Sequence, residues 1–149
     1  MTVSRTYPAV PLIGVSVLCH HDDKALLVKR GRPPFLGHWS LPGGLVDLGE
    51  PLEIAAGREL LEETGVTARL SGPVETFDSI HRDTAGKVVS HYVLTVFVGS
   101  YQSGIAAAGD DAAAVDWIAI DRLDALTTTP GTPERIRRIL TRINESVCR

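Results

Sequence analysis

A cluster of acidic residues lies near the middle of the chain, in the segment Arg58-Glu59-Leu60-Leu61-Glu62-Glu63. In a helix, Glu59 is one turn from Glu63 and three residues from Glu62, so the three carboxylates share one face. Like charges on one helical face repel each other unless a cation neutralises them. The spacing therefore predicts a site for a hard divalent cation, Mg²⁺ or alternatively Mn²⁺, both of which prefer oxygen ligands.

The distribution of charge along the chain supports this interpretation. Residues 43–65 hold six acidic residues and one basic residue, Arg58, which is a net charge of −5 against −3 for the whole chain. A concentrated acidic segment in a chain that is otherwise near neutral favours cation binding over nucleic-acid binding. The alternative interpretation is a solvated acidic helix face without a ligand.

A glycine-rich segment, Leu41-Pro42-Gly43-Gly44, precedes the acidic segment. Because glycine has no side chain, the backbone there can approach other groups closely and offer a carbonyl oxygen to the same cation. A divalent cation can bridge phosphate oxygens and activate water, so the combination is suited to phosphate substrates.

Strands and helices that alternate along the chain must position these groups, which predicts an α/β fold. A helix is expected over 51–64, because Pro51 suits a first helical turn and Gly65 suits the left-handed position after the last turn. Upstream, the pattern indicates a strand hairpin over 12–19 and 25–30, followed by a loop with short extended pieces over 31–44. Downstream we expect extended segments over 67–80, 88–100 and 115–120, a mobile loop over 102–114, a helical turn at Asp121 and a final helix from Thr132-Pro133.

Composition limits the class of protein. With 149 residues, 44% of them hydrophobic, we expect a single domain over 1–149. We find no apolar run of membrane-spanning length and no convincing signal peptide, so we expect a cytoplasmic protein without a membrane partner. Cys19 and Cys148 are far apart in the sequence and neither belongs to a CxxC motif. This argues against a disulfide framework and against a cysteine zinc site.

The acidic segment resembles a known motif. It matches the signature box of the Nudix hydrolases at every defined position. The matching residues and the gaps between them are Gly44, five residues, Glu50, seven residues, Arg58-Glu59-Leu60, one residue, Glu62-Glu63, one residue and Gly65-Val66. The resemblance implies an α/β/α sandwich around a mixed β-sheet, with the box as a loop–helix–loop. It also implies hydrolysis, by attack of water on phosphorus, of a nucleoside diphosphate linked to another moiety.

The same resemblance implies roles for individual residues. Carried onto this sequence, Glu59 and Glu63 are metal ligands, Glu62 is an additional ligand or holds a bound water, and the Gly43 carbonyl also binds metal. Arg58 orients Glu59 by a charge-assisted hydrogen bond and pairs with Glu50.

The general base remains open, because family members use either a glutamate of the box or an acidic residue on a loop outside it. Asp111 stands six residues before Trp117 and resembles the extra metal-binding acid of some members. We therefore count it among the catalytic candidates with Arg58, Glu59 and Glu62. The alternative for Asp110 and Asp111 is a solvated loop.

Three further segments resemble bacterial ADP-ribose pyrophosphatase-like Nudix proteins: Arg30-Gly31-Arg32-Pro33-Pro34, Trp39 to Gly44, and His91-Tyr92-Val93-Leu94. This resemblance implies cleavage of ADP-ribose to AMP and ribose 5-phosphate, with Arg30 and Arg32 binding the substrate. One alternative is a house-cleaning hydrolase of nucleoside triphosphates, CDP-linked compounds or dinucleotides. Another is a nucleotide-binding regulator without turnover, which the intact box argues against. We also expect a nucleotide as the substrate and no nucleic-acid partner. Analogy with the family indicates a homodimer.

Overall fold

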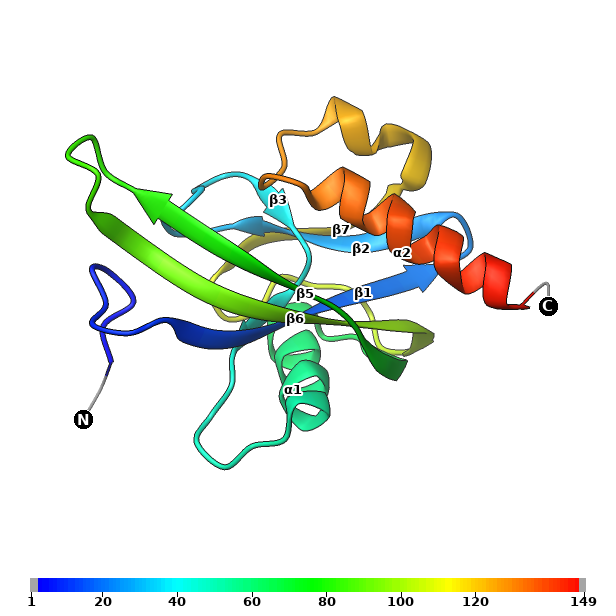
Figure 1. The fold of residues 1–149 in the computed structure, drawn as a ribbon. Coiled ribbons are helices and arrows are strands. Elements are labelled where there is room, and N and C mark those ends of the chain that lie inside the picture. Colours follow the sequence, from blue (N-terminus) through cyan, green and yellow to red (C-terminus); the bar gives the residue numbers. More distant parts are fainter. Residues whose placement is uncertain (1–2, 148–149) are drawn as a thin grey trace.

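The structure, a computed structural model, describes residues 3–147, so Cys148 lies outside the described part of the chain. Strands and helices alternate as the sequence predicts (Figure 1). In chain order they are β1 (Leu12–His21), β2 (Lys24–Arg30), β3 (Trp39–Ser40), β4 (Gly43–Leu45), α1 (Leu52–Thr64), β5 (Thr67–Arg82), β6 (Val88–Ser103), β7 (Ala112–Ala119), the 3₁₀ helix η1 (Ile120–Ala125) and α2 (Thr132–Val147).

The strands form one mixed sheet. Its main order is β3-β2-β1-β6-β5, with β4 added to β1 and β7 added to β2. The central pair β1 and β6 is parallel, from Leu12 beside Tyr92 to His20 beside Ser100, whereas the other pairs are antiparallel. Strand β1 therefore lies at the centre of the fold and carries β4, the strand that holds Gly43 and Gly44, on one edge.

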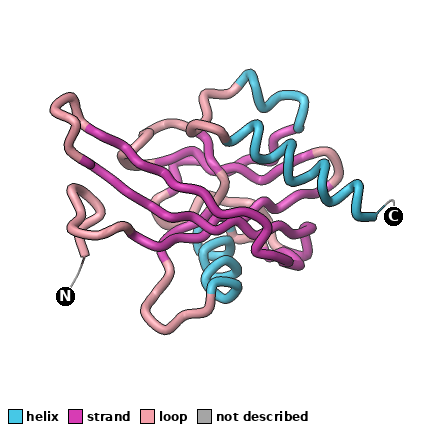
Figure 2. The backbone as a smooth tube through the Cα atoms, viewed as in Figure 1, coloured by secondary structure: helices cyan, strands magenta, loops and turns pink. Residues whose placement is uncertain are grey.

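Each face of the sheet carries a hydrophobic core. Because successive side chains of a strand point to opposite faces, Val17 of β1 packs on the α1 side while its neighbour Leu18 packs on the α2 side. Phe97 and Val98 of β6 divide between the two cores in the same way. Helix α1 covers one face, and α2 with η1 covers the other (Figures 1 and 2). The α/β/α sandwich with a mixed sheet is confirmed.

Helix α1 ends where the sequence predicts, at Thr64, and begins one residue later than predicted, at Leu52. Pro51 precedes the first helical residue, and Gly65 adopts the left-handed conformation with φ 75° while its N–H donates to the Leu61 carbonyl. The face of α1 that packs on the sheet contains the buried residues Ala55, Ala56 and Leu60. This packing fixes the rotation of the helix, and with it the direction in which the glutamates of the box project.

The segment between β6 and β7 differs from the sequence prediction. We expected a loop over 102–114, but β6 extends to Ser103 and β7 begins at Ala112, which leaves residues 104–111 as the loop. Small residues have weak intrinsic strand propensity, yet Ala112 and Ala114 pair with β2 because an open strand edge is available there. Among the described residues no helix is long and apolar enough to cross a bilayer.

Candidate active site

Three carboxylates from two separate segments meet at one end of helix α1. Oxygen atoms of Glu59, Glu62 and Asp110 all lie within 4.8 Å of one another, and we call these three residues the carboxylate cluster. Glu59 is buried, whereas Glu62 and Asp110 are exposed. The structure thus brings together two of the predicted ligands from the box and adds an acid from the 104–111 loop.

Glu59 is confined between a glycine and an arginine. A Cβ atom on Gly44 would lie 2.4 Å from the Glu59 carboxylate, so the carboxylate occupies space that any other residue at position 44 would fill. On its other side the carboxylate accepts a 2.8 Å hydrogen bond from Arg58 Nη1. The glycine in the box is therefore needed here for close approach rather than for a left-handed backbone conformation.

Arg58 connects the start of the box to its helix. Its Nε and Nη2 atoms donate to the two oxygens of Glu50 at 2.7 and 2.8 Å, and Nη1 also donates to Glu62 at 3.1 Å. The pairing of Arg58 with Glu50, and its bond to Glu59, are as the sequence implied. Hydrogen bonds from Arg58 and from the Asp47 amide lower the pKa of Glu50 to about 2, so this carboxylate stays charged at any physiological pH.

Asp110 reaches the cluster because its loop is attached to the C-terminal end of α1. The last carbonyls of a helix have no partner within the helix. Here Ala107 N–H donates to the Thr64 carbonyl and Gly109 N–H donates to the Glu63 carbonyl, both at 2.9 Å. A Cβ atom on Gly109 would lie 2.4 Å from the Glu62 carbonyl oxygen, so glycine is required for this approach. Asp110 itself turns the chain, with φ 50°.

Asp111, the acid singled out from the sequence, has a different partner. Its carboxylate forms an ion pair with Arg32 at 2.7 Å, while the carboxylate that joins the box glutamates belongs to Asp110. The spacing to Trp117 located the correct loop but could not distinguish two adjacent aspartates whose carboxylates diverge. The available signal was Gly109, which precedes Asp110 and permits its close approach to the helix.

Glu63 lies near the cluster without being one of its three members. Burial raises the pKa of its carboxyl to about 7, and the charges of Glu59 and Asp110 act in the same direction. The Gly43 amide and the Arg30 charge oppose this shift. Burial also raises the pKa of Glu59, against the opposing effect of Arg58. The role of the Gly43 carbonyl toward a metal stays a prediction.

The raised pKa of Glu63 predicts a pH dependence of stability. In metal-free protein the folded state keeps this proton up to about pH 7, whereas the unfolded chain loses it near the ordinary glutamate pKa of 4.5. The unfolded state therefore binds fewer protons across this window, and the stability contributed by protonated Glu63 is lost as pH rises from about 4.5 to about 7.

Chemical denaturation in EDTA from about pH 5 to about pH 8 checks this expectation. Glu63→Gln should lose less free energy of unfolding over that range than the wild type. Glu53→Gln, an exposed position in the first turn of the same helix, is the control and should follow the wild type. Parallel pH curves for wild type and Glu63→Gln contradict the assignment.

Arg30 contributes a half-buried cation close to these acids. Its Nε donates to the Pro34 carbonyl at 2.6 Å, which fixes the side chain at the end of β2. Burial lowers the pKa of its guanidinium, while the charges of Tyr92 and Glu63 oppose that shift.

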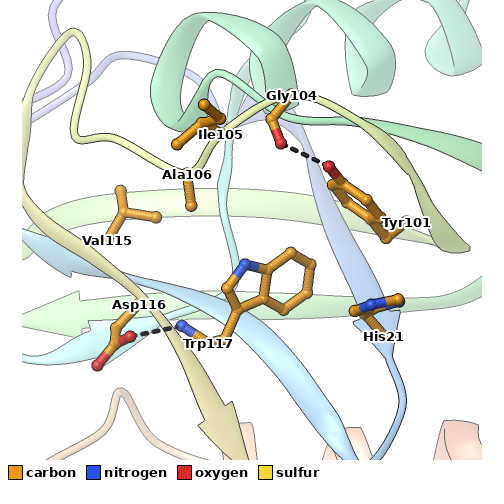
Figure 3. A pocket seen from close by; sticks show the side chains of 8 residues that line it. All are labelled: His21, Tyr101, Gly104, Ile105, Ala106, Val115, Asp116 and Trp117. Carbon is orange, nitrogen blue, oxygen red and sulfur yellow. Dashed lines mark hydrogen bonds between the residues drawn. The ribbon is translucent and has the colours of Figure 1, made fainter.

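A pocket of about 450 Å³ lies on the α1 side of the sheet, apart from these charged groups (Figure 3). The rings of His21, Tyr101 and Trp117 form one wall, with centroids 5.0 to 6.0 Å apart. Ile105 and Ala106 of the 104–111 loop form the opposite wall (Figure 3). Neither the carboxylate cluster nor Arg30 lines this pocket, so it is separate from the candidate active site.

Comparison with known proteins gives a consistent result. A family model described as the NUDIX domain matches residues 10–139. An ADP-ribose pyrophosphatase from Methanocaldococcus jannaschii is 36% identical over 116 residues, which cover 78% of this chain and 66% of that protein. This chain therefore spans slightly less than two thirds of that relative's length.

Solved structures show the same architecture. A MutT NUDIX hydrolase from Burkholderia pseudomallei aligns with a TM-score of 0.69 at 31% identity, over 86% of this chain and 97% of the other. The NUDIX domain of Shewanella oneidensis NrtR, solved in complex with ADP ribose, aligns with a TM-score of 0.73 at 25% identity, over 90% of this chain and 89% of the other. Both alignments extend well beyond the 23 residues of the signature box.

Proposed function

The chain belongs to the Nudix hydrolase family, and on that premise we propose that it uses a divalent cation to cleave the pyrophosphate of a nucleoside diphosphate linked to another moiety, with ADP-ribose as the substrate. The observation that carries the proposal is the carboxylate cluster of Glu59, Glu62 and Asp110, with the cation of Arg30 near the adjacent Glu63. ADP-ribose is favoured because the relative from M. jannaschii is named for that substrate and the NrtR domain was solved with it.

The donor set fits Mg²⁺ or Mn²⁺. Three carboxylate oxygens lie within 4.8 Å of one another, and Gly44 leaves open the space that the Glu59 carboxylate occupies. Oxygen-only donors suit hard cations. We assign Glu59, Glu62 and Asp110 to hold the cation, with Glu63 and the Gly43 carbonyl completing the set. When bound, the cation supplies positive charge against phosphate oxygens and makes water more acidic.

Two arginines beside the cluster, Arg58 and Arg30, position the carboxylates and bind the substrate phosphate, respectively. Arg58 donates to both Glu59 and Glu62, which fixes the direction of these two carboxylates. Arg30 is placed to bind a phosphate oxygen of the substrate, because its half-buried guanidinium is held by the Pro34 carbonyl.

We propose Asp110 as the acceptor of the proton from the attacking water. No ion pair joins Asp110 to a basic side chain in residues 3–147, whereas Glu59 and Glu62 both accept hydrogen bonds from Arg58. Asp110 is thus the cluster acid that no guanidinium binds, so one of its oxygens would be available to accept a proton while the other holds the cation. The sequence had left this role open between the box glutamates and Asp111.

Hydrolysis of ADP-ribose in the presence of Mg²⁺ is the expected result, with AMP and ribose 5-phosphate as products. A panel of ADP-ribose, other nucleoside diphosphate sugars, dinucleotides and nucleoside triphosphates tests this, with products separated by chromatography. Hydrolysis in ¹⁸O-labelled water shows which of the two phosphorus atoms the water attacks. Rapid cleavage of a triphosphate with ADP-ribose untouched contradicts the substrate while leaving the chemistry in place.

A further inference from the structure

Two loops that are far apart in the sequence meet beside the carboxylate cluster. One is residues 31–38, which follow β2, and the other is residues 104–111, which precede β7. The pairing of β2 with β7 is irregular between Lys29 and Arg30 and ends where Arg30 faces Ala112. Beyond this pair, Gly31 lies against the backbone of Asp111.

Two contacts join the loops there. A Cβ atom on Gly31 would lie 2.3 Å from the Asp111 carbonyl oxygen, so the two backbones are in direct contact. The guanidinium of Arg32, the next residue, forms an ion pair with the Asp111 carboxylate at 2.7 Å. We call the contacts of Gly31 and Arg32 with Asp111 the loop latch.

The residue beside the latch is Asp110 of the carboxylate cluster. On one side it is preceded by Gly109, whose N–H donates to the Glu63 carbonyl at the end of α1. On the other side it is followed by Asp111 in the latch. Asp110 itself has a left-handed backbone, with φ 50°, a conformation that is uncommon for residues other than glycine but that aspartate tolerates.

We propose that the loop latch holds the Asp110 carboxylate beside Glu59 and Glu62, so that Arg32 and Asp111 are positioning residues of the metal site. Neither is then a substrate ligand or a catalytic group. The effect on turnover rests on the proposed function above, whereas the effect on cation binding does not. The side chains of Arg32 and Asp111 are 45% and 53% exposed, so the ion pair is weak. Breaking it should change the equilibrium between the held and the released loop by only about twofold to fivefold.

A double-mutant cycle in the full chain tests the latch. The variants are Arg32→Gln, Asp111→Asn, the double variant, and the charge-swapped Arg32→Asp/Asp111→Arg. Mn²⁺ affinity is measured by titration without substrate, and kcat and KM are measured with ADP-ribose. Each single variant should weaken Mn²⁺ binding by about twofold to fivefold and lower kcat similarly, with KM little changed. The double variant should be no worse than either single variant, and the charge swap should recover much of the loss.

Two further variants separate the latch from general effects of charge and folding. Gly31→Ala adds a methyl group against the Asp111 carbonyl without changing charge, and should weaken Mn²⁺ binding in the same direction. Arg137→Gln and Asp124→Asn break an exposed ion pair of 2.8 Å between α2 and η1, and should leave Mn²⁺ affinity and kcat unchanged.

The outcomes are distinct. If Arg32→Gln raises KM while Mn²⁺ affinity stays at the wild-type value and Asp111→Asn has no effect, Arg32 binds substrate and the latch is overturned. If no pyrophosphate substrate is cleaved but Mn²⁺ affinity follows the cycle above, the proposed function fails and the latch stands. If the wild type does not bind Mn²⁺, both are overturned.

Discussion

Replacing Glu59 with glutamine is expected to lower kcat by roughly three orders of magnitude, because it removes a buried metal-binding oxygen at the centre of the carboxylate cluster. Glutamine has the same shape and keeps an oxygen for the hydrogen bond from Arg58 Nη1. The change is therefore one of charge rather than of packing. Burial raises the pKa of Glu59, so its charged form is unfavourable without a cation, and metal-free Glu59→Gln should be as stable as the wild type or more stable.

Thermal melts with EDTA and with Mg²⁺ measure the binding part of this prediction. A cation that binds the folded cluster alone should stabilise the wild type by about 2.7 kcal/mol at a hundred times its Kd. Glu59→Gln should lose most of that gain. Glu53→Gln, on the exposed first turn of the same helix, should keep both the gain and the activity. A full Mg²⁺ shift in Glu59→Gln would show that Glu59 is not a ligand.

Asp110→Asn should lower kcat by about a hundredfold or more, because the variant loses a cluster carboxylate and the proposed proton acceptor together. Asparagine tolerates the left-handed backbone that Asp110 adopts, so the loop should keep its path. The neighbouring Asp111→Asn removes the same charge from the same loop, yet its effect should stay within about fivefold.

Steady-state kinetics of the two variants, with circular dichroism as a check on folding, settle which aspartate serves the site. If Asp111→Asn is the more damaging of the two, the structural assignment is reversed and the original prediction for Asp111 holds. If both variants keep near wild-type kcat, the acceptor is one of the box glutamates, and the loop is a solvated one.

Much of this site was predictable because it depends on spacing within one helix. Pro51 and Gly65 set the ends of α1, and the separation of Glu59 and Glu62 by three residues placed them on one face before any fold was known. The alternation of strands and helices along the chain likewise predicted an α/β fold, whereas the α/β/α sandwich was implied by the resemblance to the Nudix hydrolases. These features follow from local geometry, which the order of residues determines directly.

The contacts across loops could not be obtained in this way. Sequence spacing indicated an acid near Trp117, but only the attachment of Gly109 to the end of α1 decides that Asp110, and not Asp111, joins the cluster. The ion pair of Arg32 with Asp111, some eighty residues later in the chain, was likewise not indicated by the sequence. Loop backbones have no fixed period, so which of two adjacent side chains faces a site is set by the packing of distant segments against each other.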